Sequence, residues 1–459
     1  MGQPEAAGAA RGSREENSSV ATIDRAEAGR QAKALCALVA RDRPEAEEQF
    51  SLLPREQQRE VVLAASPEER IDLILLAEDP EPLVQTLPED DLHRTVHVVG
   101  RWESQEVIEL ATEDQINYML DHECWRGEKL DSRTFSDWLR LFMDCDDEQV
   151  FRLLTAINAD LLALAHKKHV RFDKDAMING EYVADPGGVR GTNSTVQEFL
   201  ERLYALDPNL WLRLMAWVRS HSRATIEADA VEGKEARLRG KGFPAPTLAI
   251  TVYYPVEFDV NGLLDAWYKT FCGKTASEER ALLVPPDRDS MFLQRVMEEA
   301  VARSEDEFLH LRLESQLVNI ANKVMIADQV DLADLYRQKE AVDKVRRYIN
   351  VGLEATCDGT LDQGVMRLHE EQLEHYFRLG GMLFDALATA VVELEKAEHK
   401  GEGSVVEGQW AHVYFALIEP EPHIPNKART GAGRTITTLA EYRYAWELVW
   451  ELERILRRR

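Results

Sequence analysis

The strongest constraint on the fold of this chain is a helix-opening motif that recurs between residues 24 and 170. Each copy combines a proline or a capping residue with acidic side chains, which suit the positive end of a helix dipole. The copies lie at residues 53–56, 66–69, 87–91, 112–115 and 146–149. Apolar residues follow at helical spacing, for example Val150, Leu153 and Leu154. Because such short helices are unstable alone, the motif predicts an N-terminal superhelical stack of short helical hairpins over residues 23–170.

The composition changes after this stack. Residues 171–192 contain Asn179-Gly180 and Pro186-Gly187-Gly188, turn sequences that predict either a linker or a small hairpin. Helical spacing then resumes, so we expect residues 193–459 to form a larger helical C-terminal domain and residues 1–22 a disordered tail. Residues 248–256 are β-branched and aromatic enough for one buried strand, which a proline within them disfavours. The predicted fold class is mainly all-α, with at most a minor β element.

The charge balance narrows the classes of partner. The chain carries 82 acidic and 55 basic side chains, a net charge of −27, which disfavours binding to nucleic acid or to an anionic membrane surface. No segment approaches the roughly 18 consecutive apolar residues of a membrane helix, and the N-terminus has no secretory pattern. The five cysteines are scattered and form no C-x-x-C pair, which favours reduced thiols. We therefore expect a cytoplasmic protein without membrane insertion.

Several segments resemble known proteins. The SPEE and LPEDD words within residues 53–100 resemble the cytosolic N-terminal domain of the magnesium transporter MgtE and, more distantly, the helical repeats of the flagellar switch protein FliG. The words LYALDPNLWLRLM, RLRGKGFPAP and HYFRLGGMLFDAL resemble an uncharacterised bacterial family that joins an MgtE-like region to a further helical domain. This resemblance spans nearly all of residues 30–459 and implies a helical fold in a bacterial cytoplasm, but no activity. The chain lacks the membrane helices of the transporter, so it is not a magnesium channel.

Acidic residues at the helix starts of the MgtE-like region are the candidate metal ligands. Asp90 and Asp91, together with Glu89, Glu113 and Asp114, offer carboxylate oxygens, which hard cations such as Mg²⁺ prefer. The other interpretation is that these acidic side chains are simply exposed to solvent, because no spacing in the sequence brings several of their carboxylates together. We assign Asp90 and Asp91 as a candidate magnesium site and predict no other cofactor.

Two histidine pairs have more than one interpretation. His93 and His97 lie four residues apart, so both imidazoles share one face of a helix and could share a metal. Arg94 stands where a zinc protease has its glutamate. The other interpretation is that the two histidines are partly exposed side chains next to the apolar face of the helix. His166 and His169 end a helix, where protonated side chains suit the helix dipole.

Three further patterns fall short of a known site. His369 and His375 lack the E-x-x-H pattern of di-iron bundles. Residues 272–275, CGKT, match the end of a phosphate-binding loop, but Tyr268 replaces its first glycine and the preceding residues have helical spacing. Residues 429–434 are glycine-rich and basic, which is typical of a loop that leads into the last helix. We therefore predict no nucleotide site.

No pattern in the chain names a reaction, and we predict no catalytic residue. Stacked helix pairs present a curved face that suits docking to another protein, and Trp102, Trp125 and Trp211 lie on helical segments without a catalytic motif. The sequence favours a non-enzymatic helical-repeat protein that acts as an interaction or regulatory scaffold for a protein partner. A divalent-cation-responsive regulator, or an enzyme that uses the C-terminal domain, is the alternative.

Overall fold

The computed structural model of the protein is predominantly helical. It describes residues 24–173, 177–178, 181–182, 186–272, 291–357, 359–399, 406, 408–425 and 433–457. Helical residues make up 74% of this described part, and the strands within it pair only as two-stranded sheets. The predicted fold class, mainly all-α, is confirmed. The tail predicted for residues 1–22 lies outside the described residues.

The chain divides into two compact units, Met1–Gly233 and Lys234–Arg459. Each unit has its own hydrophobic core, and the core of the first unit includes Phe199, Trp211 and Leu214. The observed division therefore lies beyond the predicted linker at residues 171–192, because the helices that follow this segment bury their apolar faces in the first unit.

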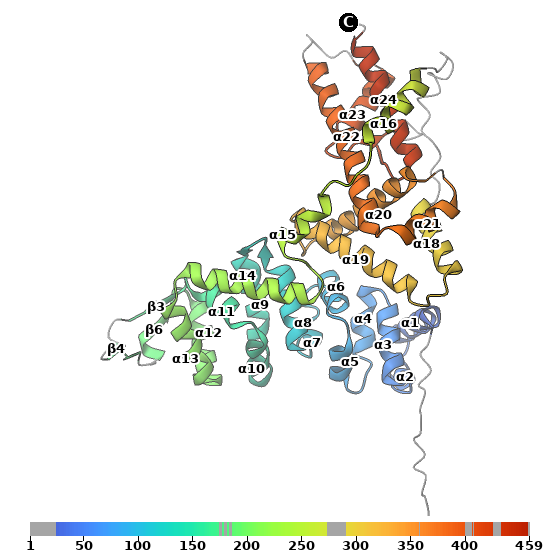
Figure 1. The fold of residues 1–459 in the computed structure, drawn as a ribbon. Helices are drawn as coiled ribbons and strands as arrows, with labels where there is room; N and C mark the ends of the chain where they lie inside the picture. Colours follow the sequence, from blue (N-terminus) through green and yellow to red (C-terminus); the bar gives the residue numbers. More distant parts are fainter. Residues whose placement is uncertain are drawn as a thin grey trace, which may run out of the picture. The chain divides into compact units, whose positions relative to one another are not determined.

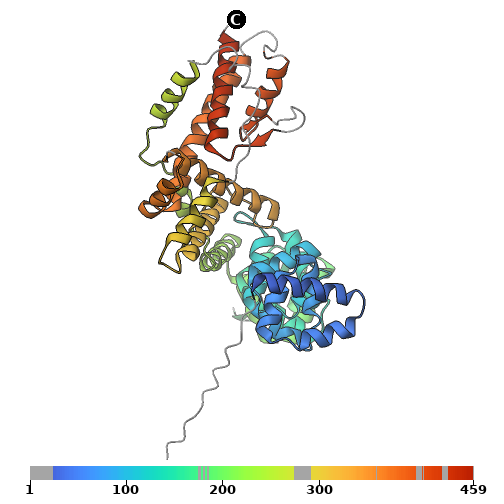
Figure 2. The same ribbon diagram turned by 90° about the vertical axis from the view of Figure 1, so that its right-hand side faces the viewer.

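The first unit is a succession of mostly short helices. They are α1 (Arg25–Val39), α2 (Arg43–Ser51), α3 (Arg55–Ala64), α4 (Pro67–Ile74), α5 (Pro80–Thr86), α6 (Glu89–Val99), α7 (Gln105–Ile108), α8 (Glu113–Glu123), α9 (Ser132–Met143), α10 (Asp147–Ala156), α11 (Ala159–His166), α12 (Ser194–Leu206) and α13 (Pro208–Ser220). A longer helix, α14 (Arg223–Gly240), continues across the division. Helices two apart in the chain contact each other, for example α1 with α3, α6 with α8 and α11 with α13. Figure 1 shows the series as a row from α1 to α13, and Figure 2 views the row from the α1 end.

Side chains at the helix starts explain where several of these helices begin. The Glu69 carboxylate accepts hydrogen bonds from the backbone nitrogen (3.3 Å) and the hydroxyl (2.9 Å) of Ser66, ahead of α4. Thr112 and Gln115 cap each other reciprocally at the start of α8. At α10, the Asp146 carboxylate accepts from the backbone nitrogen of Gln149 at 2.9 Å. The copies of the helix-opening motif at these three positions therefore act as helix caps.

A minor β element lies between residues 170 and 191, in the segment where the sequence predicts it. Strand β3 (Val170–Phe172) pairs antiparallel with β6 (Val189–Gly191), with Arg171 opposite Arg190. Between them lie the pair β4 (Met177–Ile178) with β5 (Glu181–Tyr182) and the 3₁₀ turn η2 (Pro186–Gly188), whereas Asn179 and Gly180 lie outside the described residues. The sequence does not predict two other small sheets, β1 (Trp125–Arg126) with β2 (Lys129–Leu130) and β7 (His423–Ile424) with β8 (Arg434–Thr435).

The second unit contains longer helices. They are α15 (Pro246–Ala249), η3 (Ile250–Tyr253), α16 (Val260–Cys272), α18 (Phe292–Arg303), α19 (Leu309–Ala327), α20 (Leu335–Ala355), α21 (Leu361–Glu370), α22 (Leu373–His399), α23 (Gln409–Leu417) and α24 (Leu439–Arg457). The long helices α22 and α24 lie side by side in both views (Figures 1 and 2).

The strand considered for residues 248–256 is wrong, because residues 248–253 belong to α15 and η3 and residues 254–256 have no regular secondary structure. Pro246 occupies the first turn of α15, and the Thr251 hydroxyl donates to the Leu248 carbonyl at 2.7 Å. Ala249 and Val252 are fully buried, on the segment that contacts α19. Three residues separate these two side chains, so one face of a helical turn buries both without a partner strand.

Helices α20 and α22 pack closely enough for their backbones to touch. A Cβ atom added to Gly352 of α20 would lie 2.0 Å from the Tyr376 carbonyl oxygen of α22. A Cβ atom added to Gly380 of α22 would lie 2.0 Å from the Tyr348 carbonyl oxygen of α20. Each helix thus contributes one glycine to the contact, and no larger residue fits at either position without separating the helices.

Candidate functional site

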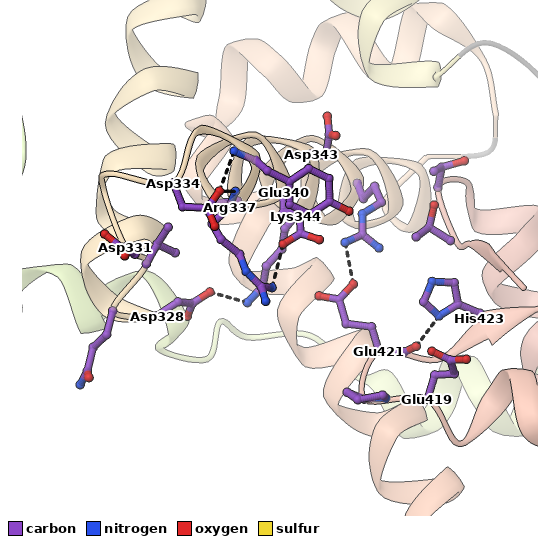
Figure 3. Close-up of a pocket in the computed structure, with 18 of the residues that line it drawn as sticks. Asp328, Asp331, Asp334, Arg337, Glu340, Asp343, Lys344, Glu419, Glu421 and His423 are labelled. Carbon is purple, nitrogen blue, oxygen red and sulfur yellow. Dashed lines mark hydrogen bonds and ion pairs between the residues drawn. The ribbon is translucent and has the colours of Figure 1, made fainter. Parts of the chain in front are cut away.

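A charged pocket of about 1220 Å³ lies in the second unit. One side is formed by the turn from α19 into α20 and by the first half of α20, and the other by the segment around β7 and β8 (Figure 3). Its acidic lining residues are Asp328, Asp331, Asp334, Glu340, Asp343, Glu419 and Glu421, and its basic ones are Arg337, Lys344 and Arg347. We refer to this cavity as the acidic pocket.

The turn between α19 and α20 places three aspartates at one end of the pocket (Figure 3). Gln329 has φ 53°, the left-handed conformation that ends many helices, and the Val330 nitrogen donates back to the Met325 carbonyl at 2.8 Å. Asp334 then caps α20 by accepting from the backbone nitrogens of Tyr336 (3.0 Å) and Arg337 (3.1 Å). The aspartates of this turn are therefore positioned by helix-ending and helix-starting geometry.

Lys344 occupies the middle of the pocket in a closed network. Its Nζ atom lies 2.8 Å from Asp328 Oδ2 and donates to the Tyr253 hydroxyl at 2.9 Å. The same hydroxyl donates to Asp328 Oδ1 at 2.8 Å. Burial and the charge of Asp328 raise the pKa of Tyr253 well above its usual range, so the hydroxyl stays a donor. Lys344 is thus held in place by Asp328 and Tyr253.

The opposite side of the pocket is tied to α20 by a second ion pair. Arg347 is buried, and its Nη2 atom lies 2.8 Å from Glu421 Oε2. The Glu421 carbonyl oxygen lies 2.6 Å from His423 Nδ1. Figure 3 shows Glu419, Glu421 and His423 together on this side, across from the aspartates of the α19–α20 turn.

The remaining charges give the pocket an excess of negative charge. Arg337 pairs with Glu340 at 2.9 Å, so each basic side chain of the lining already faces a carboxylate of the same lining. With seven carboxylates against three basic side chains, the lining has four negative charges in excess. Asp343 and Glu419 are exposed, and the exposed ring of Tyr336 offers a surface for a cation. The arrangement suits recognition of positively charged groups.

The predicted magnesium ligands lie in the first unit at the start of α6. Asp91 Oδ1 is 2.9 Å from Nη1 of Arg70, whose guanidinium is buried and also donates to the carbonyls of Leu63 (3.1 Å) and Asp91 (3.1 Å). Asp90 is exposed. The Asp91 carboxylate therefore has a structural partner, and magnesium binding at Asp90 and Asp91 stays a prediction.

The structure brings His93 and His97 of α6 together with Glu123, which ends α8. The sequence analysis did not select Glu123, because it lies on a different helix and no local spacing connects it to the histidines. Although burial raises the pKa of the Glu123 carboxyl, the neighbouring imidazoles of His93 and His97 and the charge of Arg101 outweigh it and hold this pKa well below its usual range. Among the described residues, these three side chains form a cluster in which one possible ligand atom from each lies within 4.8 Å of the others.

The prediction of a cation at the end of α11 is wrong for His166. Its ring is buried and stacked on Phe199 at a centroid distance of 4.4 Å, and its Nδ1 lies 2.7 Å from the Leu162 carbonyl oxygen. Burial lowers the pKa of His166 to about 4. The imidazole is therefore neutral at pH 7 and is part of the core, beside a smaller cavity of about 260 Å³.

The other sequence patterns do not assemble into a site in the described residues. His369 lies on α21 and His375 on α22, where Glu374 is engaged by Lys323 (2.7 Å) and Arg378 (2.5 Å). Helix α16 confirms the helical conformation expected for the residues before CGKT. Residues 273–275 and 429–432 lie outside the described residues.

No sequence motif marks the acidic pocket. Its one local signal is the word DQVDLAD at residues 328–334, which places three aspartates between two helical segments. The facing residues 419–423 are far along the chain, so only tertiary packing brings the two sides together.

Comparison with known proteins identifies a family for nearly the whole chain. The model of a family of unknown function, DUF6178, matches residues 47–457. No curated protein matches the chain, and no solved structure matches it. The resemblance to the N-terminal domain of MgtE therefore stays a prediction. None of the described helices is both long and apolar enough to cross a membrane.

Proposed function

The chain belongs to this family of unknown function, and we propose that it is a non-enzymatic interaction protein whose acidic pocket binds a basic, extended segment of a partner protein. The observation that carries the proposal is the charge arrangement of the pocket. All three basic residues of its lining are engaged by carboxylates, and four negative charges remain in excess. A ligand with several lysine or arginine side chains complements this arrangement.

The size of the pocket favours a peptide segment over a small metabolite. Its volume of about 1220 Å³ exceeds the roughly 300–1,000 Å³ of common small-molecule sites. Seven acidic and three basic side chains line the pocket, whereas small-molecule sites are predominantly apolar with a few polar groups. Tyr336, 68% exposed at the pocket, supports the same class of ligand because its ring can stack on a guanidinium or cover an ammonium group.

A cytoplasmic location and a scaffold role are part of this proposal. All five cysteines are free thiols, which suits a reducing compartment. In such a role the first unit, with its succession of short helices, supplies a second surface for assembly, as stacked helices do in repeat proteins.

Binding of a basic peptide tests the proposal. A fluorescently labelled peptide in which lysine or arginine alternates with glycine is titrated with the full chain and followed by anisotropy. The same peptide with glutamate in place of the basic residues serves as the negative control. We expect saturable binding of the basic peptide only, weakening as salt is added, because exposed ion pairs are screened.

Matched charge reversals locate the binding. Asp343→Lys combined with Glu419→Lys alters two exposed lining residues, whereas Asp265→Lys combined with Glu314→Lys makes the same change in net charge at exposed residues of the second unit outside the lining. We expect the lining variant to bind about tenfold more weakly, since each exposed ion pair contributes about 0.5 kcal/mol and the new lysines also repel the ligand. Equal weakening by both variants, or absence of binding by the wild type, would overturn the proposal.

A further inference from the structure

We propose that His93, His97 and Glu123 form a binding site for a single transition-metal ion of the Zn²⁺ class. This inference rests on the first unit and is independent of the acidic pocket. Helix α6 presents the two histidines one turn apart, and α8 ends at Glu123 beside them. His93 Nε2 lies 3.5 Å from Glu123 Oε1, and His97 Nδ1 lies 3.9 Å from the same oxygen. All three ligand atoms lie within 4.8 Å of one another.

These separations suit a shared ion better than direct hydrogen bonds. With metal–ligand distances of about 2.1 Å, two ligands of a tetrahedral zinc ion lie about 3.4 Å apart. The histidine-to-carboxylate separations of 3.5 and 3.9 Å are close to this value and longer than a good N–H···O bond. Small side-chain movements therefore bring all three atoms to bonding distance from one ion.

The His93 side chain has an unpartnered atom that faces the cluster. It is only 3% exposed, and its Nε2 has no hydrogen-bond partner. A buried polar nitrogen without a partner is costly, and an ion is one of the features that satisfies such an atom. His97, with 36% of its side chain exposed, leaves a route by which an ion enters the site.

Neighbouring side chains orient the Glu123 carboxylate towards the histidines. Its Oε2 accepts hydrogen bonds from Trp138 Nε1 at 2.9 Å and from Arg101 Nη2 at 3.0 Å. The guanidinium of Arg101 lies over the Trp138 ring, 5.2 Å from its centroid, which fixes both donors. The other oxygen, Oε1, is the one nearest to both histidines. Such outer hydrogen bonds are a regular feature of metal sites because they hold a ligand in one orientation.

The donor set selects the class of metal. Two imidazole nitrogens and one carboxylate oxygen suit Zn²⁺ and related ions such as Co²⁺ and Fe²⁺, whereas Mg²⁺ and Ca²⁺ prefer sites made only of oxygen ligands. Three protein ligands leave a further coordination position for water or for a ligand from another molecule. In the HRTVH sequence of α6, Arg94 replaces the glutamate that acts as the base in zinc proteases, so the sequence does not match that class of enzyme.

Metal titration of the full chain, purified without a histidine tag, tests the site. Binding of Zn²⁺ is measured by competition with a chromophoric chelator, and Co²⁺ is added separately to read its coordination from the visible absorption spectrum. We expect one ion per chain, an intense tetrahedral Co²⁺ spectrum that Zn²⁺ abolishes, and no displacement by excess Mg²⁺. An unsaturable isotherm, or a spectrum of six-coordinate Co²⁺ only, would show that the cluster is a buried ion-pair network without a metal.

Variants assign the ligands. His97→Asn and Glu123→Gln each remove one ligand atom, and we expect a loss of affinity of at least a hundredfold. His369→Asn makes the same change at an exposed histidine of the second unit, and Asp90→Asn with Asp91→Asn removes the predicted magnesium ligands, so both leave Zn²⁺ binding unchanged. Because His97 is half-exposed, His97→Asn is expected to keep the circular dichroism spectrum of the wild type while losing the Zn²⁺-dependent rise in melting temperature. Retention of the stoichiometric site in His97→Asn and Glu123→Gln, or its loss in either control, refutes the assignment.

Discussion

Two neighbouring glycines in α22 are expected to respond in opposite ways to replacement by alanine. A Cβ atom at Gly380 would lie 2.0 Å from the Tyr348 carbonyl oxygen, 2.7 Å from its carbonyl carbon and 2.9 Å from its Cα atom. All three atoms belong to the backbone of α20, so no side-chain rotation relieves the clash. A Cβ atom at Gly381 would have no heavy atom outside its own helix within 4 Å.

The expected change in stability follows from packing for Gly380→Ala and from helix propensity for Gly381→Ala. A carbon–oxygen contact normally requires about 3.4 Å, so Gly380→Ala forces α20 and α22 apart by more than about 1 Å. Overpacking of a close-packed core typically costs about 1–3 kcal/mol, and a backbone clash belongs at the upper end of this range. Gly381→Ala removes conformational entropy from the unfolded chain and is expected to stabilise the second unit by about 0.5–1 kcal/mol. The two variants should therefore differ by about 3 kcal/mol.

Hydrogen exchange measured by mass spectrometry at increasing urea concentrations reports the stability of the second unit separately from that of the first unit. The free energy of opening is read from peptides of α20 and α22, while peptides of α6 and α8 report on the first unit as an internal control. We expect Gly380→Ala to lower protection in the second unit alone and Gly381→Ala to preserve or raise it. Equal protection in the two variants would refute the inferred backbone contact.

Two further substitutions test buried polar groups. Because the pKa of His166 falls from about 6.5 in the unfolded chain to about 4 in the folded one, the contribution of His166 to stability is constant well above pH 6.5 and falls by up to about 3 kcal/mol as the pH drops to 4. His166→Phe should remove this proton uptake, and urea unfolding of wild type and variant at pH 7 and pH 4.5 should show a smaller acid destabilisation in the variant. Asn350 is fully buried, accepts from the Leu293 nitrogen at 2.7 Å and donates to the Thr437 carbonyl at 2.8 Å. Asn350→Leu removes both hydrogen bonds from a buried site, so we expect a loss of about 3 kcal/mol in the second unit; an unchanged melting temperature would contradict this network.

The sequence by itself was sufficient for the fold class and for several helix starts. At Ser66, Thr112 and Asp146, the capping hydrogen bonds connect residues three apart in the chain, so the local sequence contains both partners. The minor β element near residues 170–191 was also among the predictions, because turn sequences within this segment allow a small hairpin.

Tertiary structure decided the features that depend on residues distant in the chain. Residues 248–253 became helical because α19 offers a surface for one helical face. His166 became neutral because Phe199 and the surrounding core exclude water from it. The candidate sites follow the same rule: Glu123 meets His93 and His97 only when α8 packs on α6, and Glu421 faces Arg347 only across the folded second unit. Short-range hydrogen bonds are encoded in a few consecutive residues, whereas burial, charge pairing and ligand convergence depend on which distant segments the hydrophobic core brings into contact.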